Sequence, residues 1–286
     1  MEIQRNISFG SNETERHEDL KRLIEHYLSS EDVVEYDRFD EIVEKSILRE
    51  LESKELDINY LEISENYNID TIRHEVINII RLMTNIKTLN FSDNLIQDQE
   101  EYYSLSEAFN NLTNLTSINL SLCDITNGSE IFENLRNCTE LIHLDLRVNS
   151  ISSGIESLAK AELRKLEYID LSFNQIEPEG ATSLAEVLRV NKSLTHVNFN
   201  YNKFGPEGAT SLAEVLGELK VLTCFYLTGN MIQEEGATSI AKALGQSDTL
   251  VQLDLDIGDD DIGSEGAAYI TEILAQCTAL TRITIL

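Results

Sequence analysis

Apolar and polar residues follow a phrase that recurs along most of this chain. The phrase reads Leu-x-x-Ile-x-Leu-x-x-Asn-x-Ile, with Val or Phe at some apolar places, and its clearest copies begin 28 residues apart at Leu166, Leu194 and Leu222. Tracing it outward gives nine copies, which begin at Ile58, Ile86, Leu115, Leu141, Leu166, Leu194, Leu222, Leu250 and Leu280. A fixed period of this length indicates a solenoid, in which each unit buries its apolar face against its neighbours.

Each copy has two halves with different periodicity. Apolar residues alternate from Leu194 to Phe199, which predicts a short strand with one buried side. Between Glu179 and Leu188 they lie three and four residues apart, which predicts a helix, and the recurring Glu-Gly-Ala suggests that such helices are entered through a glycine. Parallel strands pack about 4.8 Å apart and helices about 10 Å apart, so the stack should curve with a concave sheet inside and convex helices outside. The spacing also predicts that the third and fourth repeats are shortened.

A polar residue closes the strand phrase in most copies. Asn occupies this place at 66, 94, 149, 174, 202 and 230, Cys123 replaces it in the third copy, and Asp260 is expected to replace it in the eighth. A buried amide at this turn can satisfy backbone groups of adjacent repeats. We therefore assign this ladder to the scaffold.

These motifs resemble the ribonuclease-inhibitor class of leucine-rich repeats over residues 55–286. The resemblance implies an α/β horseshoe that binds proteins, often through its concave strands. Relatives include enzyme inhibitors, sensor domains of immune receptors, the activator of the Ran GTPase, and effectors that intracellular bacteria deliver into host cells. The nucleotide-binding phrase Gly-x-x-x-x-Gly-Lys-Ser/Thr is not found in this chain.

The two ends of the chain differ from the repeats. Residues 1–54 carry two amphipathic helical stripes, which we interpret as a cap over the first repeat, with a separate recognition or dimerisation pair as the alternative. The chain stops at Leu286 within a strand phrase, so we expect either further chain or a covered edge in the natural protein. A monomer is expected unless this edge pairs.

Charge and cysteine content narrow the expected setting. The formal charge is −29, which disfavours nucleic acid and anionic membranes and favours a basic or neutral polar protein surface as partner. No apolar run approaches the length of about 20 residues of a membrane span, and no signal region opens the chain. Four scattered cysteines form no disulfide framework. We expect a cytoplasmic protein without cofactors, with delivery into a host-cell cytosol as a further option.

The concave face supplies the candidate binding residues. Counting along the strands places aromatic, imidazole and acidic side chains together from the fourth repeat onward, a mixture expected of a protein-binding face. Just before the ladder, Leu122, Val148, Phe173 and Tyr201 should form an apolar stripe along the rim, unless they fold onto the loops as local core. The predicted contact residues are His143, Asp145, Arg147, Tyr168, Asp170, Phe173, His196, Asn198, Tyr201, Tyr226, Asp254 and Asp256.

Two groups of residues in the sequence could indicate a catalytic or a metal site. His196 and Cys224 should be neighbours on adjacent strands, but an open sheet offers no oxyanion hole or shaped pocket for a nucleophile. The acidic segment from Asp254 to Glu265 partly mimics a calcium loop, yet it lacks the central glycine and follows a strand instead of a helix. We therefore expect no catalytic residues and no metal site.

The function predicted from the sequence is binding without catalysis. The concave face would grip a folded protein, most simply an enzyme whose active site it occludes, in a bacterial effector or a regulator of an effector. A GTPase activator is one alternative, with Arg147 as the basic residue in the middle of the arc. A scaffold or sensor module from a larger receptor is the other.

Overall fold

The computed structural model describes residues 60–62, 77, 80–81, 83–96, 99–245, 247–255 and 264–285. The expected helical cap at 1–54, the contact residue Asp256, the ladder position Asp260 and most of the calcium-like segment lie outside these ranges. The description below concerns the repeats from the first strand onward.

The strands form one parallel sheet in the order of the sequence, as the periodicity predicts. They begin two residues after the start of each phrase, and neighbouring strands pair at equivalent positions, as in His143 with Tyr168 and His196 with Cys224. The strands are β1 (Tyr60–Glu62), β2 (Thr88–Asn90), β3 (Ser117–Asn119), β4 (His143–Asp145), β5 (Tyr168–Asp170), β6 (His196–Asn198), β7 (Cys224–Tyr226), β8 (Gln252–Leu255) and β9 (Arg282–Ile285).

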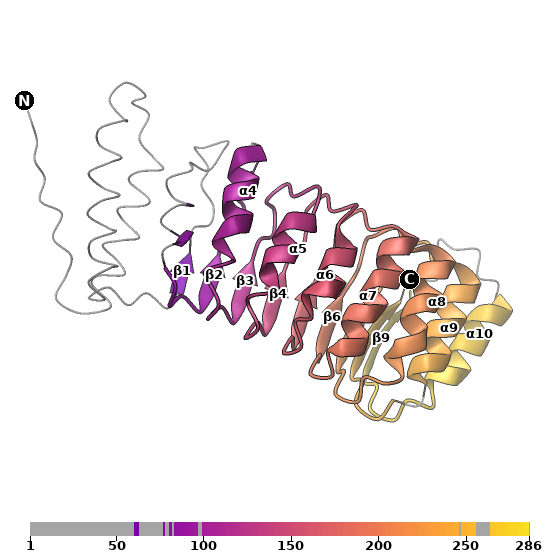
Figure 1. Cartoon of the computed structure of the whole chain (residues 1–286). Helices are drawn as coiled ribbons and strands as arrows, with labels where there is room; N and C mark the ends of the chain where they lie inside the picture. Colours follow the sequence, from indigo (N-terminus) through magenta and orange to yellow (C-terminus); the bar gives the residue numbers. More distant parts are fainter. Residues whose placement is uncertain are drawn as a thin grey trace, which may run out of the picture.

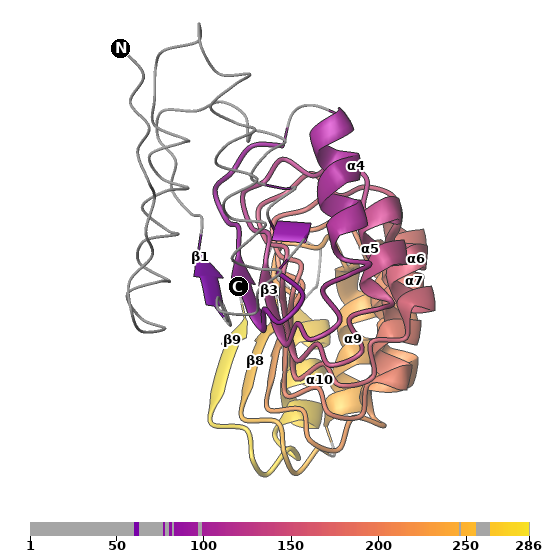
Figure 2. The same ribbon diagram turned by 60° about the vertical axis from the view of Figure 1, so that its left-hand side comes forward.

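Helices form a second layer on one face of this sheet. They are α4 (Gln99–Ala108), α5 (Ser129–Leu135), α6 (Ile155–Ala161), α7 (Pro178–Val190), α8 (Gly205–Leu216), α9 (Gln233–Leu244) and α10 (Ser264–Leu274). Figure 1 shows them side by side along the stack, and Figure 2 shows the strands on one side and the helices on the other. The predicted α/β solenoid with sheet and helices on opposite faces is confirmed.

The core lies between the two layers and repeats with the sequence. In the second to eighth turns the three apolar positions of the phrase, such as Leu141, Leu144 and Leu146 around β4, are buried almost completely. Burying one such side chain stabilises the fold by about 1.5–3 kcal/mol. Because every turn contributes the same three positions, the strands keep one register throughout the stack.

The shortened repeats lose helix and keep strand. Helices α5 and α6 have 7 residues each, whereas α7 has 13. The shortening predicted from the sequence is therefore accommodated on the helical side, and the spacing of concave side chains is preserved.

The Glu-Gly-Ala glycines have a different role from the expected one. Gly208 and Gly236 lie within the first turns of α8 and α9 and have no positive φ. A Cβ added at Gly208 would lie 2.7 Å from Ala181 Cβ, and one at Gly236 would lie 2.8 Å from Ala209 Cβ. These glycines let successive helices approach closely and are not points of entry.

The ladder joins successive turns as predicted. Asn149 donates to the carbonyls of Leu120 and Leu146, both at 2.9 Å, and its oxygen accepts the amides of Cys123 and Ile125. Asn174, Asn202 and Asn230 likewise donate to carbonyls of their own and the preceding turn. Burial raises the pKa of the Cys123 thiol to about 12, so it stays protonated and lies 3.2 Å from the Phe91 carbonyl.

Candidate functional site

The concave face of the sheet brings together the aromatic and imidazole side chains predicted from its first column. The rings of His143 and Tyr168 stack with centroids 4.1 Å apart and planes 4° apart, and the His196 ring lies 6.3 Å from Tyr168. Burial lowers the pKa of His143, against the opposing effect of the Asp145 and Asp170 carboxylates. A flat, neutral stack therefore occupies the middle of the sheet.

Side chains in the middle column of the concave face, at the last residue of the strands β2 to β6, form hydrogen bonds that help to terminate the strands. In β2 to β6 a side-chain oxygen at this place accepts the amide two residues later, as Asp145 does from Arg147 and Asp170 does from Ser172. Asn and Asp form such local bonds readily, and these bonds compete with a continued strand. The polar residues of this column are thus part of the scaffold.

The two aspartates of the column are more enclosed than expected. Asp145 is 5 % exposed and Asp170 is 3 % exposed. Asp170 accepts bonds from the Ser172 amide and hydroxyl, from Asn198 Nδ2 at 2.9 Å and from the Tyr168 hydroxyl. Burial raises the pKa of Asp145, although Arg147 Nε lies 3.5 Å from its Oδ2. Carboxylates already engaged in hydrogen bonds within the sheet are poorly suited to steer a partner at long range.

The seventh turn departs from this arrangement. Tyr226 occupies the middle column there and offers no oxygen to the amide of Thr228, which instead donates to Asn200 Oδ1 of the preceding turn at 2.7 Å. Burial and a hydrogen bond with Cys224 raise the pKa of Tyr226 to about 12. Tyr226 is half-buried on the face, as is Asp254 beside it.

The rim stripe, Leu122, Val148, Phe173 and Tyr201, lies where the chain leaves the strands. Its side chains are 41–51 % exposed, so they do not fold into the core. The Phe173 and Tyr201 rings stack with centroids 4.3 Å apart and planes 21° apart. The stripe is thus a continuous apolar surface across four turns.

Every residue of the rim stripe has a left-handed backbone. The φ angles are 59° at Leu122, 53° at Val148, 54° at Phe173 and 54° at Tyr201. This conformation costs an ordinary L-residue about 1–2 kcal/mol, and β-branched or bulky residues adopt it rarely. Each amide of the stripe donates to a carbonyl of the next turn, as Val148 does to Ser172 at 2.9 Å, which holds the backbone in place.

Glycine takes the equivalent place in the seventh turn. Gly229 has φ 71°, and a Cβ there would lie 2.6 Å from the Tyr201 ring. The Tyr201 ring therefore lies against Gly229, and Met231, two residues later in the same turn, is 55 % exposed. The turn geometry does not itself require a large side chain.

The predicted neighbours His196 and Cys224 each pair with another side chain. His196 Nδ1 pairs with the Thr195 hydroxyl at 2.9 Å and the Cys224 thiol pairs with Tyr226, so the two neighbours form no nucleophile and base couple. Among the described residues no group of three or more His, Cys, Asp or Glu side chains is placed to hold a metal ion. In the same part of the chain no helix is long and apolar enough to cross a membrane.

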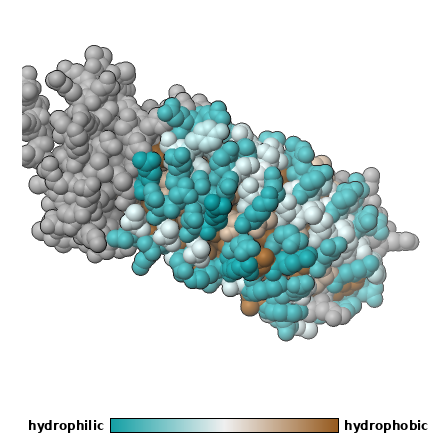
Figure 3. All heavy atoms as spheres, viewed as in Figure 1, coloured by the Kyte–Doolittle hydropathy of each residue, from teal (hydrophilic) through white to brown (hydrophobic). Residues whose placement is uncertain are grey.

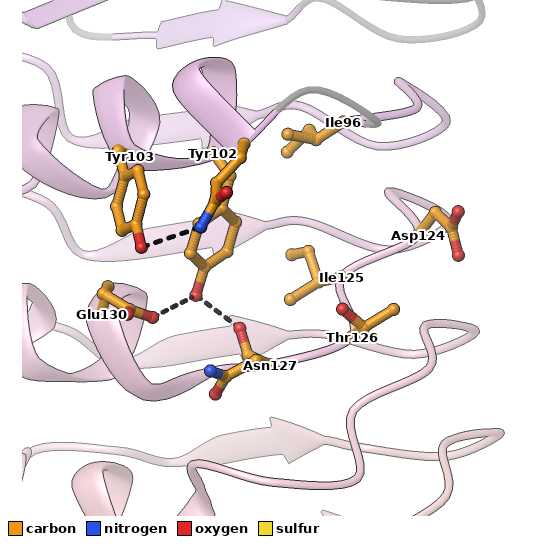
Figure 4. A pocket seen from close by; sticks show the side chains of 9 residues that line it. Ile96, Tyr102, Tyr103, Asp124, Ile125, Thr126, Asn127 and Glu130 are labelled. Atoms are coloured by element: carbon orange, nitrogen blue, oxygen red, sulfur yellow. Dashed lines mark hydrogen bonds between the residues drawn. The ribbon is translucent and has the colours of Figure 1, made fainter.

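A pocket of about 280 Å³ lies away from the concave face, between α4, α5 and the loop that joins β3 to α5 (Figure 4). Tyr102 crosses it, and the Tyr102 hydroxyl pairs with the Asn127 carbonyl and with Glu130 Oε2. Burial and the Glu130 charge raise the pKa of Tyr102. The polar atoms that cross the pocket are therefore occupied by one another.

The repeats match a known family model. The model described as Leucine Rich repeat matches residues 111–128, 162–185 and 190–213, which fall on the third, fifth and sixth turns. The fold is that of a leucine-rich repeat protein. A search of curated proteins gave no match for this leucine-rich repeat chain.

Solved structures with a similar fold include two internalins of Listeria monocytogenes. Internalin F is 17 % identical over 83 % of this chain and 69 % of its own, with a TM-score of 0.46, and internalin C2 is 18 % identical over 84 % of both chains, with a TM-score of 0.44. Actin-binding site 2 of leiomodin-1 is 18 % identical over 63 % of this chain and 89 % of its own, with a TM-score of 0.41. Similarities at this level do not indicate what this chain binds.

We did not anticipate three features of the site from the sequence. The strand-ending role of Asp145 and Asp170 has a signal, since Asn or Asp recurs at that place in five successive turns. The hydrogen bond from the Thr228 amide to Asn200 has a weaker sequence signal, which is the replacement of Asn or Asp by Tyr226 in the seventh turn. The pocket crossed by Tyr102 has none, because α4 follows no strict repeat.

Proposed function

We propose that this leucine-rich repeat protein binds a folded protein partner through the rim stripe and the adjoining concave face. The observation that supports the proposal is the exposure of four large apolar side chains on left-handed backbone. Such conformations are retained where the surroundings hold them, and they concentrate at functional places. Aromatic side chains in an exposed apolar patch commonly supply most of the energy of an interface.

Folding alone gives no reason to keep these side chains. Gly229 fills the same place without strain, and Asp93, also left-handed, shows that a residue which tolerates this conformation suffices in the second turn. The stacking of Phe173 on Tyr201 returns only about 0.5–1.5 kcal/mol. A partner that buries the stripe would supply the rest of the free energy that offsets the backbone strain.

The surface of the helical side is mostly hydrophilic. In the view of Figure 1 hydrophilic residues cover most of the described surface, with hydrophobic residues in small patches (Figure 3). The neutral stack of His143 on Tyr168, together with His196, Asn198 and Tyr226, extends the proposed interface from the rim across the sheet. Asp145 and Asp170 serve it by holding Arg147 and Tyr168.

Inhibition by occlusion is the mode of action we favour, because a curved sheet that covers a partner's active site can block it without any chemistry. A partner enzyme would lose substrate access when its active site faces the sheet. For the GTPase-activator alternative, Arg147 is the candidate basic residue, with half of its side chain exposed and its Nε 3.5 Å from Asp145 Oδ2. A reducing compartment suits the four free thiols, three of which are buried.

Comparative capture tests the interface. Phe173→Asn with Tyr201→Asn removes the aromatic surface, and Asn tolerates the left-handed backbone, so the fold should persist. Val251→Asn is the matched control, because Val251 is 41 % exposed at the opposite edge of the sheet. Quantitative mass spectrometry should find proteins retained by wild type and by the control and depleted at least about tenfold by the double variant.

Circular dichroism melts of the three proteins accompany the capture. Equal retention of every protein by wild type and the double variant, with folding intact, would show that the stripe is not the interface. A purified partner would then quantify the loss, which we expect to be about 2 kcal/mol or more.

A further inference from the structure

The strand exits of the fourth to seventh turns contain no acidic residue. These 16 residues, here called the rim window, are 147–150, 172–175, 200–203 and 228–231, and their charged members are Arg147 and Lys203. The whole chain has 51 acidic residues in 286, so about three would be expected by composition in a stretch of this size. Three of the four stripe residues, Val148, Phe173 and Tyr201, therefore lie within a window of charge +2 on a chain of charge −29. The fourth, Leu122, lies just outside the window in the third turn, two residues before Asp124.

The two cations flank the stripe on opposite sides. Arg147 precedes Val148 and faces the sheet, where its Nε lies 3.5 Å from Asp145 Oδ2 while half of its side chain stays exposed. Lys203 follows Tyr201 on the loop side, and its Nζ lies 3.4 Å from the amide oxygen of Gln175. Lys203 is thus paired with a neutral group, unlike Lys165 and Lys192, which pair with glutamates.

The spacing of the stripe fits one kind of secondary structure. Four adjacent strands place the side chains at steps of about 4.8 Å, or about 14 Å from first to last. A helix that crosses the strands presents one side chain every 5.4 Å, about 16 Å over three turns. An extended strand presents one every 6.6 Å or more on a face, about 20 Å over three steps, and falls out of step with the stripe.

We propose that the rim window accepts an amphipathic helix of the partner, with an apolar stripe on its contact face and a carboxylate on each flank. The apolar stripe packs on Leu122, Val148, Phe173 and Tyr201. One carboxylate meets Arg147 from the sheet side, and the other meets Lys203 from the loop side. This inference rests on the proposed function and specifies the partner's chemistry at that surface.

A second copy of this chain does not suit the window. Two chains of charge −29 repel, and self-repulsion of this kind keeps proteins monomeric. A basic partner helix would place like charges beside Arg147 and Lys203. The local charge thus reverses the preference for basic partners that the net charge of the whole chain suggests.

Selection from a helical peptide library tests the inference. Displayed helices of about 14 residues, randomised on one face and its flanks, are selected on the full chain and counter-selected on the Phe173→Asn, Tyr201→Asn variant. Enriched peptides should carry apolar residues three and four apart with Asp or Glu on both flanks. Binding of the synthesised peptides is measured by fluorescence anisotropy at low and physiological salt.

Charge reversal supplies the decisive comparison. Lys203→Glu should weaken peptide binding about tenfold, and more salt should weaken wild-type binding. Lys220→Glu is the matched control, because Lys220 is exposed and pairs with the Gly217 carbonyl instead of a carboxylate. This control should change affinity less than about twofold.

The outcomes separate this inference from the proposed function. Enriched peptides that need Phe173 and Tyr201 but carry basic flanks, or bind Lys203→Glu more tightly, would overturn the acidic helix and leave the interface standing. The absence of any rim-dependent helix would overturn the helix in the same way, since capture tests the interface separately. Self-association that Phe173→Asn abolishes, seen by sedimentation, would replace the partner helix with a second copy.

Discussion

The middle column of the concave sheet and the rim stripe lie three residues apart in each turn, and their side chains have exchanged the environments that their chemistry suggests. Asp145 and Asp170 are almost fully buried, whereas Val148 and Phe173 are about half exposed. The carboxylates complete the ends of strands, and the apolar groups occupy backbone that glycine would fill with less strain. Polarity alone is therefore a poor guide to which row of a repeat is scaffold and which is free to bind.

The ladder holds both rows, so its loss should have the largest effect. Asn149→Leu leaves the Leu120 carbonyl and the amides of Cys123 and Ile125 without their partner, while the Leu146 carbonyl keeps its bond from Asn174. Buried groups left unsatisfied cost about 1–3 kcal/mol each, and with partial relaxation we expect a loss of about 4 kcal/mol in the free energy of unfolding. Denaturant titration followed by circular dichroism measures it.

Asn137→Leu is the control for this change, since the Asn137 amide bonds the Asn110 side chain at the surface. It should cost less than about 0.5 kcal/mol. Equal losses for the two variants would mean that the ladder does not organise the strand exits.

The second prediction tests whether Asp170, in the middle column, belongs to the scaffold. Asp170→Asn keeps one oxygen for Ser172 and turns an NH₂ group toward Asn198 Nδ2, so the bond from Asn198 is lost, while the Tyr168 hydroxyl can accept from the new group. We expect a loss of about 2 kcal/mol in stability by denaturant titration. A change in the free energy of unfolding below about 0.5 kcal/mol would show that the fold does not depend on the carboxylate of Asp170.

Gly229 links the seventh turn to the stripe and gives the third prediction. Gly229→Ala should cost about 1–2 kcal/mol for the left-handed backbone, and the new Cβ must displace the Tyr201 ring from 2.6 Å. Differential scanning calorimetry measures the stability, and the captured partner measures the interface. A stability loss without weaker partner binding would show that Tyr201 can leave Phe173 at no cost to the interface.

The smallest effect concerns pH. Because the pKa of Asp145 is raised from its ordinary value of 3.8, the folded state holds this proton more tightly than the unfolded chain. Its contribution to stability is present below pH 3.8 and is lost as pH rises through the folded pKa. Asp145→Asn keeps the oxygen that accepts the Arg147 amide, so relative to wild type it should gain stability as pH rises from about 4 to 7.

Arg147 and solvent screen this effect, which should stay below about 1 kcal/mol. Asp124→Asn removes the same charge at an exposed, left-handed residue and serves as the control for net charge. Unfolding curves of the three proteins at several pH values decide it. A gain for Asp124→Asn equal to that for Asp145→Asn would assign the effect to net charge.

The fold could be predicted because each part of it is local. The strand period is visible at Leu194, Val197 and Phe199, and Asn202 marks the turn. The register of every repeat can therefore be predicted from the pattern of a single one. The placement of the rim stripe followed from the same register. Its exposure did not, because a residue such as Phe173 before a ladder Asn can point outward or fold onto the loop.

The concave face was harder to predict for a different reason. Whether Asp170 is free depends on donors from Ser172 within the turn and from Asn198 in the next, and one sequence phrase shows only the first. The charge of the rim window was readable from residues 147–150 and 200–203, but it becomes meaningful only once those segments are known to be adjacent. The helical cap expected at 1–54 and the role of Asp256 stay predictions.

The amide of Thr228 depends on Asn200, while the amide of Asn200 is satisfied by Asn198 of its own turn. The seventh turn thus depends on the sixth for this amide, and the sixth depends on the seventh for the amide of Tyr201, which donates to the Thr228 carbonyl at 2.7 Å. The bond from Thr228 to Asn200 is additional to these backbone bonds, so the coupling at this junction differs from that at the preceding ones, although repeats are usually treated as equivalent units. Exchanging or deleting repeats here would have to move the two turns as one block.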